Sequence, residues 1–189
     1  MSGISRYIQE CATSLAPGEK GSVWLETAGG VHSPSLHPPH TQASSLRPLL
    51  LPTVLVASPH LGGISTTLAS YESLLIRGFT VSAVLCLKDE YYRNHDFLTD
   101  YFAEKGIEVF AFDKPPERSE GDGALNQYYL THEPAAKNVV DHLDGLHDAR
   151  IAELESMPER TMSSVWWPFT QHGIVSCVRQ QSLITGQQS

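Results

Sequence analysis

Two short turns of small residues follow apolar segments in this chain, and their residue types could hold ions. The first turn, residues 26–30 (Glu-Thr-Ala-Gly-Gly), places a carboxylate before two glycines. The second turn, residues 61–66, brings Gly62 and Gly63 to the start of an expected helix. Carboxylate oxygens are ligands that Mg²⁺ takes in proteins, and the free amides of a helix start favour an anion. The two turns therefore predict a metal and an anion held close together.

Each turn also has an ordinary structural interpretation. Because small-residue turns are common, residues 26–30 could be a solvated turn that carries a surface acid. Gly62 and Gly63 could serve only the packing of a strand against a helix. No lysine follows these glycines as it does in a GxxxxGK[ST] phosphate-binding loop, so the second turn suits a carboxylate better than a triphosphate. The hydroxyls of Ser65 and Thr66 could add donors to such an anion site.

Apolar strands and helices alternate around these turns. The expected strands are residues 22–25, 54–57, 80–87 and 107–112, and the expected helices are residues 4–15, 65–77 with a cap at Ser65 or Thr66, 96–105 and 133–155. Residues 31–47 are expected to be a long irregular loop. Residues 113–117 could wrap a nucleotide base or be an ordinary exit loop. This alternation predicts an α/β fold, a parallel sheet with flanking helices, which gathers ligands at the carboxyl ends of its strands.

Composition narrows the class of protein. A length of 189 residues fits one domain, or one domain with a tail. The net charge is −8 and the 13 Lys and Arg residues are scattered, which argues against a nucleic-acid-binding surface. No apolar stretch approaches the roughly 20 residues of a membrane span. The three cysteines lie far apart and predict free thiols in a reducing compartment, so we expect an intracellular chain without membrane partners.

The sequence around both turns resembles the dethiobiotin synthetase family. Residues 26–31 match its E-x-A-G-G turn, and residues 51–56 with 61–64 match its L-P-V-I-L-V…L-G-x-I stretch. Residues 166–172 (Trp-Trp-Pro-Phe-Thr-Gln-His) resemble the opening of the aminotransferase half of the eukaryotic fused enzyme. The resemblance divides the chain into the C-terminal part of a synthetase-like domain (1–156), the start of an aminotransferase-like segment (157–175) and a disordered tail (176–189).

The family resemblance implies a P-loop NTPase-like fold that lacks the N-terminal phosphate-loop strand. It implies the biotin-biosynthetic reaction that converts 7,8-diaminopelargonic acid and CO₂ to dethiobiotin with ATP and Mg²⁺. By this resemblance Glu26 is the metal ligand, and the nucleotide-binding residues are Glu26, Thr27, Ala28, Gly29, Lys114, Pro115 and Pro116. The implied substrate-binding residues are Gly29, Gly30, Gly62, Gly63, Ile64 and Ser65.

The chain departs from the family pattern at the phosphate loop with its catalytic Lys, at the second Lys that acts on the carbamate, and at the adenine-contacting Asn, where residues 87–89 read Leu-Lys-Asp. It contains no GxxxxGK[ST] sequence, so no catalytic residue is assigned and we expect this chain alone not to turn over ATP. One alternative is a non-catalytic binding module that associates with the full-length enzyme, which the resemblance implies is a homodimer. Another is a fragment of the aminotransferase, whose cofactor is pyridoxal phosphate. The resemblance implies a mitochondrial location, although we find no transit peptide in this sequence.

Overall fold

The computed structural model describes residues 6, 10–11, 22–36, 38–117, 119, 121–156 and 173–179. Its strands are β1 (Ser22–Thr27), β2 (Thr53–Ala57), β3 (Val81–Leu87), β4 (Glu108–Phe112) and β5 (Gly173–Arg179). Its helices are α2 (Gln42–Leu46), α3 (Gly63–Ile76), α4 (Asn94–Ala103) and α5 (Gly121–Glu155). Among these described helices, none is both long and apolar enough to cross a membrane.

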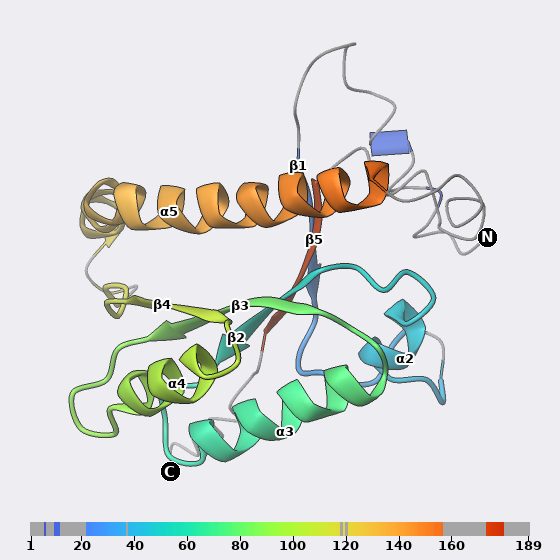
Figure 1. Cartoon of the computed structure of the whole chain (residues 1–189). Helices are drawn as coiled ribbons and strands as arrows, with labels where there is room; N and C mark the ends of the chain where they lie inside the picture. The colour runs from blue at the N-terminus through green and yellow to red at the C-terminus, as the bar shows by residue number, and fades with distance from the viewer. Residues whose placement is uncertain are drawn as a thin grey trace.

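The described strands form one parallel sheet in the order β1-β5-β2-β3-β4. Helix α5 lies along one face of this sheet, and α2, α3 and α4 cover the other (Figure 1). The predicted α/β architecture with a parallel sheet and flanking helices is therefore confirmed. The predicted strands at β1 to β4 are confirmed as well, with bounds that differ by one or two residues.

Both faces of the sheet bury apolar side chains. The larger core lies under α3 and α4, where Leu55 of β2 packs with Leu74 and Phe102, all at most 1% exposed. The smaller core lies under α5, where Val139 and Leu143 pack with residues of β2, β3 and β4. Strands covered on both faces read as continuous apolar runs, which is why the β2 and β3 segments were recognisable in the sequence.

Three helical expectations need correction. Helix α3 begins at Gly63 with Gly62 as its cap, and neither Ser65 nor Thr66 caps it. The expected loop at 31–47 contains helix α2, whose cap Thr41 accepts a hydrogen bond from the Ser44 amide at 3.3 Å. Helix α5 begins at Gly121 instead of residue 133, and Pro134 lies inside it. Glycine and proline cost a helix interior about 1 and 3 kcal/mol relative to alanine, and in α5 the contacts of Tyr128 and His132 with Asp113 hold the added first part of the helix against the end of β4.

Strand β5 is the largest departure from expectation. Residues 173–179 lie between β1 and β2, with Ser22 paired to Gly173 and Thr53 paired to Ser176. The expected disordered tail is therefore wrong for residues 176–179, which continue the largely apolar segment Gly-Ile-Val-Ser-Cys-Val-Arg and pair in parallel with strands on both sides. Residues 157–172, which include the aminotransferase-like motif, and residues 180–189 lie outside the described residues. So does most of the expected helix at 4–15, of which Arg6, Glu10 and Cys11 are helical.

Candidate functional site

The two predicted turns leave the same edge of the sheet. Strands β1 and β2 both pair in parallel with β5, so Glu26 near the end of β1 and Ser58 just after β2 lie toward the same edge of the sheet. Glu26 is level with Val54 across β5, four residues before Ser58, so at the usual strand spacing and rise the two backbones are roughly 16 Å apart. The structure thus brings the two turns to one edge of the sheet, as the sequence predicted.

The first turn is held by contacts within itself. Thr27 is buried and its hydroxyl donates to the Gly29 carbonyl at 3.3 Å. Gly29 has a φ of 94°, and a Cβ there would lie 2.6 Å from the Ser33 hydroxyl oxygen. Glycine is therefore required at position 29 by the turn itself. Glu26 and Ala28 are exposed, and Gly30 accepts a hydrogen bond from the Ser33 amide at 2.9 Å.

Glu26 presents a single exposed carboxylate at this edge. Within the described part of the chain, no three His, Cys, Asp or Glu side chains form a group that could hold a metal. A lone carboxylate fits Mg²⁺, which commonly takes one or two carboxylates and completes its shell with water and phosphate oxygens. The assignment of Glu26 as a metal ligand stays a prediction.

The second turn presents backbone amides at the start of α3. Gly62 adopts a φ of 81° and no side chain caps the helix. The Gly63 amide donates to the His60 carbonyl at 2.9 Å, whereas the amides of Ile64 and Ser65 receive no partner from the described residues. Unpaired first-turn amides carry the positive end of the helix dipole and favour an anion.

The hydroxyls near this helix start have different roles from those expected. Thr66 turns its hydroxyl back to the carbonyls of Gly62 and Gly63, at 3.1 Å each. Thr67 is fully buried and donates to the Gly63 carbonyl at 2.7 Å. The expectation that Thr66 adds a donor toward an anion is therefore not met, because its proton is used inside the helix. Ser65 is exposed at the helix start.

A shallow, open groove of about 730 Å³ begins at the second turn. Its lining includes Gly62, Ile64 and Ser65 at the start of α3, Tyr92 in the loop before α4, and Asn94, the first residue of α4. The residues between them on α3 are mostly apolar and end at Glu72. Gly63 is buried and does not line the groove. Three of the four predicted substrate-binding residues of the second turn thus line one groove.

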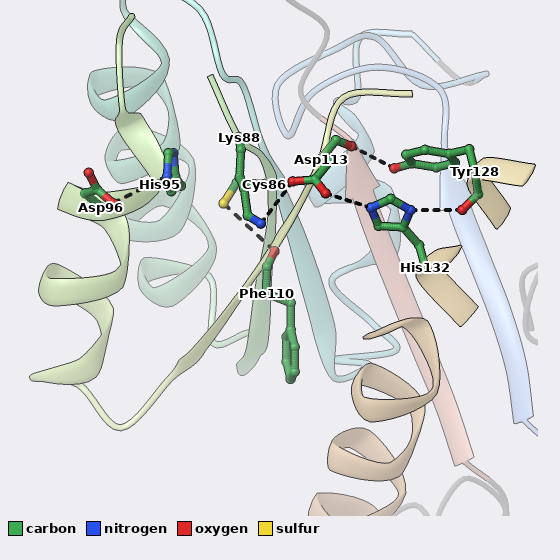
Figure 2. Close-up of polar contacts among 8 residues, drawn as sticks. All are labelled: Cys86, Lys88, His95, Asp96, Phe110, Asp113, Tyr128 and His132. Carbon is green, nitrogen blue, oxygen red and sulfur yellow. Dashed lines mark hydrogen bonds and ion pairs between the residues drawn. The ribbon is translucent and has the colours of Figure 1, made fainter. Parts of the chain in front are cut away.

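A polar cluster that sequence reasoning missed lies at the ends of β3 and β4 (Figure 2). Asp113 accepts a hydrogen bond from Lys88 Nζ at 3.0 Å and faces His132 Nε2 at 3.1 Å. His132 Nδ1 lies 2.9 Å from the Tyr128 carbonyl, and the Tyr128 hydroxyl donates to the Asp113 carbonyl at 2.8 Å. Because both ring nitrogens of His132 face acceptors, only the doubly protonated imidazole can donate to both.

Charges within this cluster shift its acid–base behaviour. The hydrogen bond from Lys88, followed by that from His132, lowers the pKa of Asp113 below its ordinary value. Partial burial, and then the negative charge of Asp113, raises the pKa of Tyr128. Lys114 and Pro115, which follow Asp113, are exposed, and Pro116 is half-buried. The cluster anchors the start of the predicted nucleotide-binding segment to α5, while the segment's role stays a prediction.

Three curated proteins are similar to this chain. The bifunctional dethiobiotin synthetase/adenosylmethionine-8-amino-7-oxononanoate aminotransferase of Emericella nidulans is 40% identical over 163 residues, which are 80% of this chain and 21% of that protein. The mitochondrial bifunctional dethiobiotin synthetase/7,8-diamino-pelargonic acid aminotransferases of Oryza sativa and Arabidopsis thaliana are 40% and 36% identical. Those matches cover 82% and 80% of this chain and 18% of each plant protein.

These matches fall on the dethiobiotin synthetase portion of the relatives. The matched region accounts for about a fifth of each relative's length. No protein-family model matches the chain.

Proposed function

We propose, from the premise that this chain belongs to the dethiobiotin synthetase family, that it supplies the substrate-carboxylate part of a dethiobiotin synthetase site in biotin biosynthesis. The observation that carries the proposal is the pair of glycine turns toward one sheet edge, in a chain of which 80–82% matches these relatives at 36–40% identity. The groove beside the second turn supports it, since it joins an amide-rich helix start to an apolar wall.

The chemistry of 7,8-diaminopelargonic acid suits this arrangement. Its carboxylate would accept hydrogen bonds from the amides of Ile64 and Ser65, where the helix dipole favours negative charge. Its aliphatic chain would lie along the apolar groove, which includes Ile64 and Leu68. Removal of apolar surface from water contributes roughly 25 cal/mol per Å² to such binding. The diamine end would then be directed away from the helix start.

ATP and Mg²⁺ belong to the same proposal. Mg²⁺ would bind at Glu26, and the backbone of Thr27, Ala28 and Gly29 would lie beside the phosphates. The bound ion would supply neutralisation of the charge that develops on transferred phosphoryl oxygens. Lys114, Pro115 and Pro116 would border the adenine. The sequence holds no phosphate-loop lysine, so we expect the 189-residue chain to bind substrate without turning over ATP.

Titration calorimetry with the purified chain tests this function. We expect 7,8-diaminopelargonic acid to bind at least tenfold more tightly than 7,8-diaminononane, which lacks the carboxylate. Mg²⁺ should tighten ATP binding to the chain, and Glu26→Gln should remove that effect. Equal binding of the two amines, or no binding of either, would contradict the proposal. Diaminopelargonate-dependent ATP hydrolysis would contradict the expected lack of turnover.

The second candidate is a binding module that joins the full-length enzyme, which we propose is a homodimer. Exposed apolar side chains at the two ends of α3 favour it, since Leu61, in the turn before the helix, is 81% exposed and Ile76, its last residue, is 83% exposed. A pull-down against a full-length enzyme separates the candidates, because only the module requires a stable complex.

By analogy with the plant relatives, which are named mitochondrial, we propose a mitochondrial location.

A further inference from the structure

Asn94 is the first residue of α4, and its side chain contacts the turn between β2 and α3. Its side-chain nitrogen donates to the Ser58 carbonyl at 3.1 Å and to the His60 carbonyl at 2.9 Å. Both protons of the amide are therefore used on two carbonyls of one turn. Asn94 is 6% exposed, so these bonds lie where water competes weakly.

The side chain of Asn94 is not needed to cap its own helix. Asparagine is a strong capping residue, yet the cap of α4 is Arg93, which has a φ of 50° and no side-chain cap bond. The loop before it is held instead by Asp89, whose carboxylate accepts from the amides of Tyr91 and Tyr92 at 3.0 and 2.8 Å. The uncommon backbone conformation at Arg93 therefore delivers Asn94 to the neighbouring turn.

The turn that Asn94 contacts leads directly into the first turn of α3. The His60 carbonyl accepts from Asn94 and also from the Gly63 amide at 2.9 Å. A Cβ at Gly63 would lie 2.1 Å from the Ser58 carbonyl oxygen and 2.6 Å from the Asn94 nitrogen. The end of β2, the start of α3 and the side chain of Asn94 therefore pack so closely that no methyl group fits at Gly63.

We propose that Asn94 is a positioning residue for the anion-binding end of the groove. It fixes the carbonyls of Ser58 and His60, and through them the direction of the amides of Ile64 and Ser65. This inference rests on the proposed function, because it assigns those amides to the substrate carboxylate. Asn94 itself acts through the turn, and no contact with substrate is required of it.

The test compares Asn94→Asp with Asn138→Asp in the full 189-residue chain. The first change replaces the donor by a carboxylate that faces two carbonyl oxygens, and the second makes the same change on the exposed surface of α5. We expect Asn94→Asp to weaken 7,8-diaminopelargonic acid binding at least tenfold and to leave 7,8-diaminononane binding unchanged. Hydrogen exchange at the Gly63 amide should accelerate at least tenfold, with the Leu74 amide on the same helix unaffected.

Asn94→Ser provides a second variant that removes both bonds without adding charge, in case the aspartate variant does not fold. Equal affinities in the Asn94 and Asn138 variants would overturn the proposal. So would a uniform rise of exchange along α3, because that is the signature of general destabilisation. If the unmodified chain binds neither amine, the proposed function itself fails. The Gly63 exchange rate still decides whether Asn94 holds the turn.

Discussion

His32 Nε2 lies 2.8 Å from the hydroxyl of Ser73, and this contact joins the loop after β1 to the last turn of α3. Arg77 donates to the same hydroxyl at 2.6 Å and to the Ser73 carbonyl at 2.9 Å. The hydroxyl accepts from Arg77, and its remaining proton and lone pair allow a hydrogen bond with either tautomer of His32. The helix that begins at the second turn is thereby tied to the chain that leaves the first turn.

Replacement of Ser73 by alanine should loosen this connection. Ser73 is largely buried, and its loss leaves the Arg77 and His32 nitrogens without that partner. We expect the free energy of unfolding to fall by about 1–3 kcal/mol in urea denaturation. Ser119→Ala, at an exposed position, is the matched control and should change it by less than about 0.5 kcal/mol. Equal effects of the two substitutions would contradict a structural role for the contact.

Alanine at Gly63 should be much more harmful than alanine at another helical glycine. The added Cβ would overlap the Ser58 carbonyl, so Gly63→Ala should lower stability by more than about 2 kcal/mol. Gly145, on α5, has open space around its Cβ position, and Gly145→Ala should stabilise by about 0.5–1 kcal/mol. Thermal unfolding followed by circular dichroism measures both. A tolerated Gly63→Ala would mean that the turn packs less closely than described.

The Asp113 cluster should make stability depend on acid pH. Lys88 and His132 lower the pKa of Asp113 in the folded chain, so its carboxylate contributes stability above the unfolded pKa of about 3.9. That contribution is lost as the pH falls through the lowered folded pKa. We expect Asp113→Asn to melt below the unmodified chain at pH 6 and the gap to close toward pH 2. Asp100→Asn, which replaces an exposed carboxylate on α4, is the control. A difference in melting temperature between Asp113→Asn and the unmodified chain that does not change with pH would contradict this dependence on the Asp113 carboxylate.

Cys86 should resist alkylation in the folded chain. Burial raises the pKa of its thiol to about 11, against a weaker opposing effect of Lys88. The thiolate is the reacting species, so at pH 8 only about 0.1% of this thiol is reactive. Peptide mass spectrometry after iodoacetamide treatment should show Cys11 modified first, and Cys86 only at higher pH or after unfolding. Equal labelling of the two would contradict the burial of Cys86.

Most of the sheet could be predicted because its signals are local. The apolar runs at β2 and β3 and the glycines that follow β1 and β2 are continuous in the sequence, so each strand and turn is legible on its own. Strand β5 was missed because its position depends on pairing with β1 and β2, far away in the chain. The early start of α5 was missed because Gly121 and Pro134 read as breakers when packing is ignored.

The candidate site divides in the same way. Gly62 and Ser65 were recognised from one short motif. Asn94 was not, because it acts on carbonyls 34 and 36 residues earlier. Lys88 and His132 contact Asp113 from positions 25 and 19 residues away in the sequence, and no periodicity or motif predicts these contacts.

Amide chemical-shift mapping with 7,8-diaminopelargonic acid shows whether the start of α3 binds the substrate carboxylate. We expect the largest shifts on titration at the amides of residues 62–65. We expect 7,8-diaminononane, which has no carboxylate, to leave these amide shifts unchanged. Shifts confined to other parts of the chain, or identical shifts with both compounds, would contradict a carboxylate site at this helix start.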